Sequence, residues 1–522
     1  MAKINPRQKK TQINKVTLMD FSATHFKGIR FESDSFYTSL SNRLYDIIQQ
    51  AIGGSMAPEY IKRLAINLAC YVEDLVSGCG VWSAFTSLHE KKYGRKLPFF
   101  NLDKPAIPVP YDDELPSLHA VQFLIWYTLN GAKPDTVMSP LNPALSMLSI
   151  RLMPELTDAY ENAPDSPARP AIMPEEEAGV PLFFQIRNLC SWLCTRCYLT
   201  RVNDMQSVSA DYKAFISHLL DNIKSPDKKG QTEYAVESFV PMNAHIGPLA
   251  IPAYEWLAEI VDLYHEEEEE QYLPLLREIK SLPYQYYKYK KVDTQTAILV
   301  SLKGQEMSMS ATTLPGEKFS SEVKEGMSAL MSLVWFDGAW VMNSIGLQAL
   351  PEEAYDMALK NYREKQDNDN NTYHYLMKNL KNKRLGVYAD YKEYMAKAYP
   401  DKPRNENIPP EIIRDLEECD NMVYFINSDG TTTILPGWAT CIKLRGNKFY
   451  DKAEATDDGI SLICNQSMTT PEMRQYMIDN KMLADAAMKS VISETAGRRL
   501  FQENIRFFND YYSRDSMKYF IL

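Results

Sequence analysis

The spacing of apolar residues changes its period near residue 284, and this change constrains the fold more than any other feature of the chain. From about residue 34 to residue 280 the apolar residues recur at steps of three and four, as they do along one face of a helix. After residue 284 come segments rich in strand formers, "YQYYKYKKV" and "QTAILVSLKG", and a hairpin with Asp337-Gly338 at its turn. The sequence therefore predicts an α+β protein: a helix-dominated N-terminal region, a small antiparallel β-sheet in the middle and a mixed α/β C-terminal part.

The same patterns divide the chain into parts. A proline-rich surface loop near 160–181 interrupts the helical domain, and "KQDNDNN" is a polar interruption of the charged helical linker. In the C-terminal part we expect a strand pair about Asp429-Gly430, a third strand at 439–444, and helices to the end of the chain. The predicted parts are a flexible basic arm at 1–15, a helical domain at 16–280, a small antiparallel β-sheet at 281–348, a helical linker at 349–407 and an α+β region at 408–522.

The composition of the 522-residue chain is that of an ordinary globular protein, with 45% hydrophobic and 24% charged residues. There is no run of about 18 apolar residues, which a membrane-spanning helix needs, and the N-terminus is charged where a signal peptide is apolar. Eight cysteines are too few for a disulfide scaffold in a chain of this length. We therefore expect a soluble, cytoplasmic protein with free thiols and no contact with a membrane.

Three cysteines, Cys190, Cys194 and Cys197, follow the C-x-x-x-C-x-x-C spacing of enzymes that hold a four-iron cluster and cleave S-adenosylmethionine. In such enzymes the cysteines lie on a loop after a strand, whereas here they continue a helical stripe that begins at Phe183 and Ile186. A free cysteine packs as a small apolar residue, so the stripe needs no metal. We interpret the three thiols as core residues and expect no cofactor.

Two segments have a composition suited to nucleic acid, although the net charge of −11 argues against a protein that binds it over its whole surface. The N-terminal arm carries basic residues before any acid, and the segment at 284–292 alternates tyrosine with lysine. We favour a solvated terminus and a strand with one buried face as the explanations. The candidate binding residues are Lys3, Arg7, Lys9, Lys10 and Lys15 in the arm, and Tyr287, Lys288 and Tyr289 in the strand.

The best candidates for catalysis are clustered carboxylates, because neighbouring acids bind a divalent ion or share a proton. Glu73 and Asp74 are adjacent near the end of a helix that Gly78 terminates. Acids near helix ends are more often solvated or capping, and this is the competing interpretation. The further candidates are Asp20, Asp34, Asp112, Asp113 and Glu114.

Two other acidic segments have the composition of a metal site without its spacing. The run "HEEEEEQ" at 265–271 distributes its glutamates around a helix, so we interpret it as a solvated helix end. The segment "DNDNNTYHYLMK" resembles the start of a calcium loop, but Thr372 and Lys378 replace the glycine and glutamate that such a loop needs. We expect a polar loop there.

Three segments of the N-terminal third are similar to a known family: "LMDFSATHFKGIRFESDSFYTSLSNRLYDII", "LACYVEDLVSGCGVWSAFTSLHEKKYGRKLPFF" and "DELPSLHAVQFLIWYTL". They resemble a family from Bacteroidetes that is known only as a domain of unknown function. "GPLAIPAYEWLAEI" and "WFDGAWVMN" are also similar, so the resemblance extends to about residue 347. It implies a soluble, helix-rich bacterial protein and adds no activity, cofactor or catalytic residue.

Two functional hypotheses of different classes follow. The first is a non-catalytic binding or scaffold protein for a macromolecular partner, protein or nucleic acid, because the sequence contains no catalytic signature and is rich in tyrosine and acid. The alternative is a divalent-metal-dependent hydrolase on phosphoester or nucleotide substrates that uses Glu73 and Asp74. The sequence alone favours the first.

Overall fold

The chain folds into two compact units, each made of two segments. In the computed structural model the first unit comprises Met1–Asn203 and Ala253–Leu273, and the second comprises Asp204–Pro252 and Pro274–Leu522. Residues 204–252 thus belong to the second unit, although they lie within the helical domain predicted at 16–280. The structure describes residues 15–100, 115–132, 137–168, 180–222, 224–264, 269–311, 319–401, 414 and 416–521.

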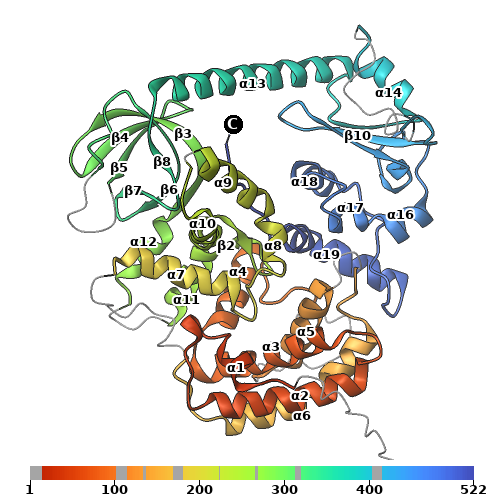
Figure 1. The fold of residues 1–522 in the computed structure, drawn as a ribbon. Coiled ribbons are helices and arrows are strands. Elements are labelled where there is room, and N and C mark those ends of the chain that lie inside the picture. The colour runs from red at the N-terminus through yellow and green to blue at the C-terminus, as the bar shows by residue number, and fades with distance from the viewer. Residues whose placement is uncertain are drawn as a thin grey trace, which may run out of the picture. The chain divides into compact units, whose positions relative to one another are not determined.

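All secondary-structure elements among the described residues of the first unit are helices. They are α1 (Leu18–Ser22), the 3-10 helix η1 (Phe26–Gly28), α2 (Asp34–Ile52), α3 (Pro58–Ser77), α4 (Val81–Tyr93), α5 (Leu118–Ala132), α6 (Pro143–Asn162), α7 (Leu182–Thr195) and α11 (Ala253–Tyr264). α3 packs against α2, α5 and α6, as Figure 1 shows, and α11 packs against α4 and α7. α3 is therefore the central helix of this unit.

The local sequence explains why α3 begins and ends where it does. Pro58 occupies the first turn, where the missing N–H of a proline costs no hydrogen bond. Gly78 ends the helix at φ 63°, a left-handed conformation that favours glycine. Residues 64–74 are all buried, and the helix that the apolar spacing predicts there is confirmed. The polar side chains on this stretch consequently point into the interior of the unit.

Among the described residues, no single helix combines the length and the apolar character needed to cross a membrane. α3 and α4 meet that test only as a pair, and the two are bent by 90° at the break between them. The apolar face of α3 is covered by the neighbouring helices of its own unit.

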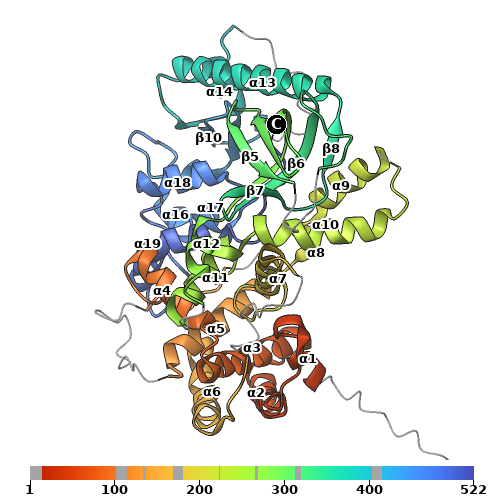
Figure 2. The ribbon, with the colours of Figure 1, turned by 90° about the vertical axis from the view of Figure 1, so that its left-hand side faces the viewer.

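The second unit contains a small barrel. Its strands are β3 (Lys280–Val292), β4 (Thr296–Ser301), β5 (Glu306–Ser310), β6 (Ser328–Phe336), β7 (Ala339–Met342) and β8 (Leu347–Leu350). Their order is β3-β4-β5-β7-β6-β8, and β3 also pairs with β6, which closes the first five strands of that order on themselves (Figures 1 and 2). β5 and β7 are parallel and the other pairs are antiparallel. The predicted hairpin is confirmed, with Asp337 and Gly338 both at positive φ between β6 and β7.

The tyrosines of β3 belong to the interior of the barrel. Tyr287 and Tyr289 are 0% and 1% exposed and pack in its core, so their rings are not available to stack on bases. Lys288, on the opposite face, forms an ion pair with Glu352. The base-stacking role considered for Tyr287 and Tyr289 is therefore corrected: the alternation of tyrosine and lysine has the period of two of a strand with one buried face.

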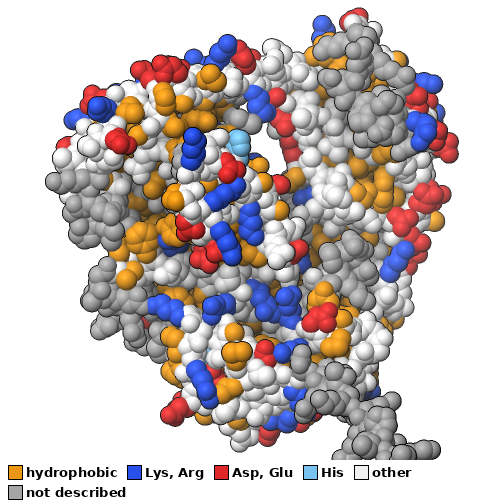
Figure 3. Space-filling model, viewed as in Figure 1, with side chains coloured by type: hydrophobic (Ala, Val, Ile, Leu, Met, Phe, Trp, Pro, Cys, Tyr) orange, Lys and Arg blue, Asp and Glu red, His pale blue; other side chains and the backbone are white. Residues whose placement is uncertain are grey.

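One long helix, α13 (Glu352–Asn379), contacts β3 and β6 of the barrel at one end and the next sheet of this unit at the other (Figure 1). It passes through residues 365–371 without a break, so the predicted polar interruption and polar loop are both wrong. Lys365 and Asp369, one turn apart, form an ion pair of 2.7 Å that stabilises the helix locally. Acidic and basic side chains are mixed along this helix, as Figure 3 shows, which is typical of a solvated helix.

A second sheet lies in the C-terminal part. Its strands are β9 (Leu385–Tyr388), β10 (Met422–Ile426) and β11 (Thr432–Pro436), antiparallel in the order β11-β10-β9. The predicted strand pair about Asp429-Gly430 is confirmed as β10 and β11. The third strand is β9, and the strand predicted at 439–444 is wrong: that segment begins in a 3-10 helix, η2 (Trp438–Cys441). A short run of buried apolar residues has no clear periodicity, so its sequence does not distinguish a strand from a helical turn.

The remaining elements of the second unit are helical, apart from one short strand pair. α18 begins with Pro471 after the Thr470 cap, as predicted, and α19 is the predicted amphipathic last helix. The bounds are α8 (Met205–Val208), α9 (Ala210–Asn222), α10 (Lys228–Asn243), β1 (His245–Ile246), β2 (Ile251–Pro252), α12 (Tyr272–Glu278), α14 (Tyr391–Ala398), α16 (Lys452–Asp458), α17 (Ser461–Cys464), α18 (Pro471–Asp479) and α19 (Glu494–Tyr512).

Candidate functional site

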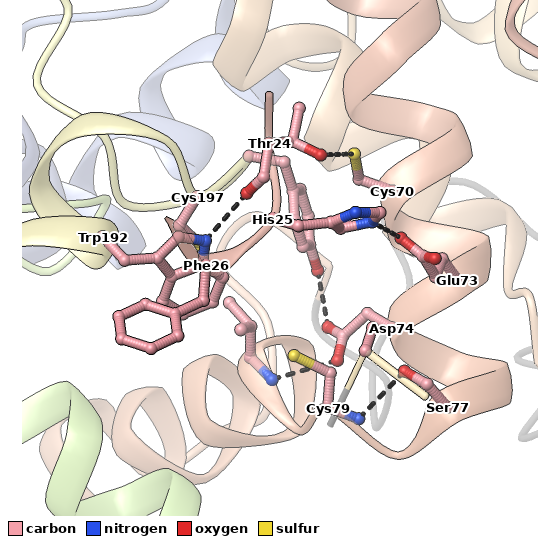
Figure 4. A pocket seen from close by; sticks show the side chains of 13 residues that line it. Thr24, His25, Phe26, Cys70, Glu73, Asp74, Ser77, Cys79, Trp192 and Cys197 are labelled. Carbon is pink, nitrogen blue, oxygen red and sulfur yellow. Dashed lines mark hydrogen bonds and ion pairs between the residues drawn. The ribbon is translucent and has the colours of Figure 1, made fainter. Parts of the chain in front are cut away.

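The described part of the first unit contains a pocket of about 410 Å³, counted with its space open to solvent (Figure 4). α3 forms one wall, the segment that leads into η1 a second, and the chain at and after the end of α7 a third. The wall combines ionisable side chains with thiols and aromatic rings. The lining residues are Thr24, His25, Phe26, Cys70, Glu73, Asp74, Ser77, Cys79, Val81, Ala168, Trp192, Cys197 and Tyr198.

His25, at the N-cap of η1, has a partner for each ring nitrogen. Nδ1 lies 3.0 Å from the carbonyl oxygen of Ile29, and because a carbonyl only accepts, Nδ1 carries a proton. Nε2 lies 2.9 Å from Oε2 of Glu73, as Figure 4 shows, and Oε1 accepts a hydrogen bond of 2.8 Å from Ser166 Oγ. His25 and Glu73 therefore share one proton between Nε2 and Oε2.

The surroundings of His25 strengthen this interaction. Burial disfavours a charge on the ring, but the hydrogen bond and the charge of Glu73, together with the charge of Asp34, outweigh burial and raise the pKa of His25. The ring packs against Phe21 and Phe31, with centroids 5.5 and 4.9 Å away. Apolar walls of this kind lower the local dielectric constant and so strengthen the charge interactions.

Asp34 is the first residue of α2 and is 0% exposed. Its Oδ1 lies 3.7 Å from His25 Nδ1, and among the described residues neither carboxylate oxygen has a hydrogen-bond partner. Burial raises the pKa of this carboxyl group, while the charge of His25 acts against the rise. A buried carboxylate without hydrogen bonds is costly unless a proton or a cation compensates its charge.

Asp74 and Glu73 are adjacent on α3, but their carboxylates interact with different partners. Oδ1 of Asp74 accepts hydrogen bonds from the backbone N–H groups of residues 80 and 81, at 2.7 and 3.1 Å. Its Oδ2 accepts from the N–H of residue 82 at 2.7 Å and from Tyr198 Oη at 2.8 Å. Burial raises the pKa of Asp74 to about 6 against the effect of these bonds. Asp74 thus stabilises the start of α4, and the capping interpretation applies to it rather than a joint site with Glu73.

His25, Asp34 and Glu73 can direct one ligand atom each to a common point, because these atoms lie within 4.8 Å of one another. Ligands that are each about 2.0–2.2 Å from one ion lie roughly 3–4.4 Å apart, so the cluster needs only a small adjustment to hold a metal. The bond from Nδ1–H to the Ile29 carbonyl is the kind that orients a metal-binding histidine and leaves Nε2 for the ion. Ser166 holds the Glu73 carboxylate in the same way.

The other candidate residues lie apart from this cluster or outside the described residues. Asp20 closes the capping box of α1 and pairs with Lys62 at 2.8 Å. Lys15 pairs with Asp46 at 3.3 Å. Outside the described residues lie Lys3, Arg7, Lys9, Lys10, Asp112, Asp113, Glu114 and residues 265–268 of the glutamate run.

The three cysteines at C-x-x-x-C-x-x-C spacing are buried in the first unit. Cys190 and Cys194 lie in α7, and Cys197 follows the end of that helix and lines the pocket. Burial raises the pKa of Cys190 to about 12 and also raises that of Cys197. The eight cysteines are free thiols, and Cys419 is the one that is only half-buried.

We expect Cys419 to react first with a disulfide reagent such as DTNB in the native chain at pH 8. The attacking species is the thiolate, and burial hides the sulfur atoms of the other seven cysteines from the reagent. The absorbance of the released thiol should correspond to about one fast-reacting cysteine, and to all eight in urea. Fast reaction of several thiols in the native chain would contradict the burial described above.

Sequence reasoning missed His25 and Ser166 as members of the site. His25 is 48 residues from Glu73, and Ser166 is 93 residues from it. Neither forms a short-range motif with an acid, so no local spacing could have indicated them. Asp34 was a candidate by residue type, without an assigned partner.

One known family matches most of the chain. Its description is "Protein of unknown function (DUF3843)", and the match covers residues 20–272 and 291–514. The chain belongs to the DUF3843 family. The DUF3843 match contains the whole His25–Asp34–Glu73 cluster and continues beyond residue 347, where the resemblance described above ended. No curated protein and no solved structure matches the chain.

Proposed function

We propose that the chain is a divalent-metal-dependent hydrolase that acts on phosphoester or nucleotide substrates and holds its ion with His25, Asp34 and Glu73. The observation that carries this proposal is the burial of two carboxylates and an imidazole around one point, with His25 and Glu73 in the wall of a pocket. Perturbed ionisable groups in a pocket are a frequent mark of an active site.

The charge balance of the cluster favours a cation. With both carboxylates ionised and the imidazole protonated, the buried group carries a net charge of −1, and Asp34 keeps two oxygens without hydrogen bonds among the described residues. A divalent ion that displaces the shared proton makes the group neutral and gives the Asp34 oxygens a partner. One imidazole and two carboxylates suit a divalent transition metal such as Mn²⁺, Fe²⁺ or Zn²⁺.

Hydrolysis is the reaction class that such a site serves most directly. A divalent ion held by His25, Asp34 and Glu73 would lower the pKa of a coordinated water towards about 7 and so supply hydroxide at neutral pH. Phosphoester hydrolysis would join a water oxygen to phosphorus and break the P–O bond to the leaving group, whose oxygen would take up a proton. Asp74 does not belong to this set, because both its oxygens are engaged at the start of α4.

The alternative of a non-catalytic scaffold has lost part of its motivation. It drew on abundant tyrosine at the surface, and many of the tyrosines are core residues instead. Those among the largest fully buried side chains are Tyr37, Tyr71, Tyr212, Tyr284, Tyr287, Tyr289, Tyr394 and Tyr511. We further propose a cytoplasmic location in a bacterial cell, which the free thiols support, since disulfides are rare in reducing compartments.

The full chain, freed of metal with a chelator, should gain activity on p-nitrophenyl phosphate or bis(p-nitrophenyl) phosphate when Mn²⁺ or Zn²⁺ is added. Glu73→Gln should lower that rate at least about 100-fold, since even partners of metal ligands typically change activity 10–100-fold. Glu155→Gln is the matched control, because Glu155 is a glutamate of the same unit that pairs with Arg43 at the surface. Its rate should equal that of the wild type.

Three results would count against the proposal. The first is a wild-type chain without any metal-stimulated hydrolysis, and the second is a rate that chelators leave unchanged. The third is an equal loss of rate in Glu73→Gln and Glu155→Gln, because it would trace the effect to the fold and not to the cluster.

A further inference from the structure

We infer that Arg63 and Arg201 form a binding site for a phosphate group in the first unit. Both guanidinium groups lack a carboxylate partner among the described residues, where each instead donates to the side-chain amide of an asparagine. Arg63 donates to Asn203 Oδ1 at 3.2 Å, and Arg201 to Asn67 Oδ1 at 3.2 Å. Other arginines of the protein pair with acids, for example Arg43 with Glu155 at 2.8 Å.

The two arginines are held in place by the fold. Arg63 and Asn67 are one turn apart on α3, and Asn67 is buried and donates to Thr128 Oγ1 at 3.1 Å. Arg201 lies in the short connection after α7, and the backbone of this connection folds back on that helix: the N–H of Val202 donates to the carbonyl of Cys194 at 2.8 Å. Asn67 therefore fixes the Arg201 guanidinium beside the face of α3 that carries Arg63.

This arrangement is unfavourable without an anion. Burial, the larger cause, and the charge of Arg63 together lower the pKa of Arg201 to about 10. Arginine keeps its charge at neutral pH, so two like charges repel each other in a partly buried place. A buried charge is normally paired, and here the compensating negative charge has to come from outside the described residues.

A phosphate group fits this pair by charge and geometry. Guanidinium groups present planar sets of N–H donors that match the oxygens of phosphate, often two bonds to one group. Among the described residues one donor of each arginine is engaged by an asparagine, which leaves its other N–H groups for such an anion. The same chemistry would accept inorganic phosphate or the phosphate of a phosphoester.

The site lies next to the pocket. Cys70, three residues after Asn67 on α3, and Cys197, whose backbone carbonyl accepts the N–H of Arg201, both line the pocket. Arg63, Asn67, Cys70 and Asp74 recur along α3 at steps of four, three and four, which places them on one side of the helix. A phosphate on the arginines would therefore position a substrate towards His25 and Glu73, a role that rests on the proposed hydrolase function.

Isothermal titration of the full chain with inorganic phosphate, in EDTA and at constant ionic strength, tests the site without any metal. We expect wild-type binding that chloride does not reproduce, about tenfold weaker in Arg63→Gln and unchanged in Arg43→Gln, the matched control at the surface. Arg201→Gln should also bind about tenfold more weakly, with circular dichroism to verify its fold. A parallel titration with a phosphomonoester shows whether the site prefers the free anion or the esterified group.

Equal phosphate affinity in the wild type, Arg63→Gln and Arg43→Gln would overturn the inference, and so would no wild-type binding beyond that of chloride. If Arg201→Gln has lost its fold, its affinity carries no information, and the comparison of phosphate binding by Arg63→Gln and Arg43→Gln decides. Because EDTA is present throughout, arginine-dependent phosphate binding in a chain that binds no Mn²⁺ would refute the metal proposal and leave this site standing.

Discussion

Asp74→Ala is expected to lower the free energy of unfolding of the first unit by about 3–5 kcal/mol, because it breaks a buried polar network. The substitution removes the acceptor of three backbone N–H groups at the start of α4 and of the Tyr198 hydroxyl. These donors are buried, so each loses a partner that water does not readily replace. An ordinary helix cap at the surface contributes less, about 1 kcal/mol.

Urea unfolding of the full chain, together with hydrogen exchange at the amides of residues 80–82, measures this effect. The exchange should become faster at those three amides, which ties the loss of stability to the start of α4. Asp46→Ala is the matched control, since Asp46 lies in α2 of the same unit and forms an exposed ion pair with Lys15. Such a pair contributes less than about 1 kcal/mol. Similar destabilisation in both variants would show that Asp74 is not a cap.

Glu73→Gln is expected to weaken the binding of Mn²⁺ or Zn²⁺ at least about 100-fold, in parallel with its effect on hydrolysis. The substitution keeps the shape of the side chain and its contact with Ser166, but it removes the negative charge beside His25 Nε2. Competition against a chelating dye of known affinity gives both dissociation constants. An affinity within about threefold of the wild type would exclude Glu73 as a ligand.

The affinity of the wild type for Mn²⁺ or Zn²⁺ should rise with pH. Each ligand has to lose its proton before it binds the ion, and the pKa values of His25 and Asp34 are both raised in the fold. The rise should therefore continue above pH 6.5, the ordinary pKa of a histidine. In the metal-free chain these two groups favour the fold most when protonated, and this contribution is lost as the pH increases. The ion should accordingly raise the melting temperature more at pH 8 than at pH 6.

The parts of the fold that the sequence predicts are those with a local physical signal. The spacing of Ile61, Leu64 and Leu68, with Pro58 before and Gly78 after, is sufficient to place α3. The Asp337-Gly338 turn likewise places a hairpin, because few residues adopt its positive φ values. Both signals depend on neighbours in the chain and need no information about the rest of the fold.

The features that the sequence did not predict depend on distant partners. The closure of the barrel pairs β3 with β6, and no residue of either strand indicates that pairing by itself. α13 was expected to break at its polar segment, but ion pairs one turn apart let a polar sequence remain helical. A strand was predicted at 439–444 because the segment is apolar. Ala439 and Ile442 are buried there, but they lie in and directly after a 3-10 helix.

The candidate site was predicted in part, for a similar reason. Glu73 and Asp74 are neighbours in the sequence, yet successive side chains on a helix point about 100° apart, so only one of them faces His25. The grouping that matters joins His25, Asp34 and Glu73 from three separate elements. The residue types alone were sufficient to identify Glu73 and Asp34 as candidates. Their convergence on a histidine is visible only in the tertiary structure.

The most direct test of the account is the amount of metal bound by the wild type and by Asp34→Asn, measured by elemental analysis after equilibrium dialysis against Mn²⁺ or Zn²⁺ at pH 8. Asparagine fills the same space without the buried charge, so the metal-free variant should melt at or above the temperature of the wild type. We predict one ion per chain in the wild type and none above background in Asp34→Asn. A wild type without bound ion, or a variant that binds one equally well, would contradict the assignment of His25, Asp34 and Glu73 as a metal site.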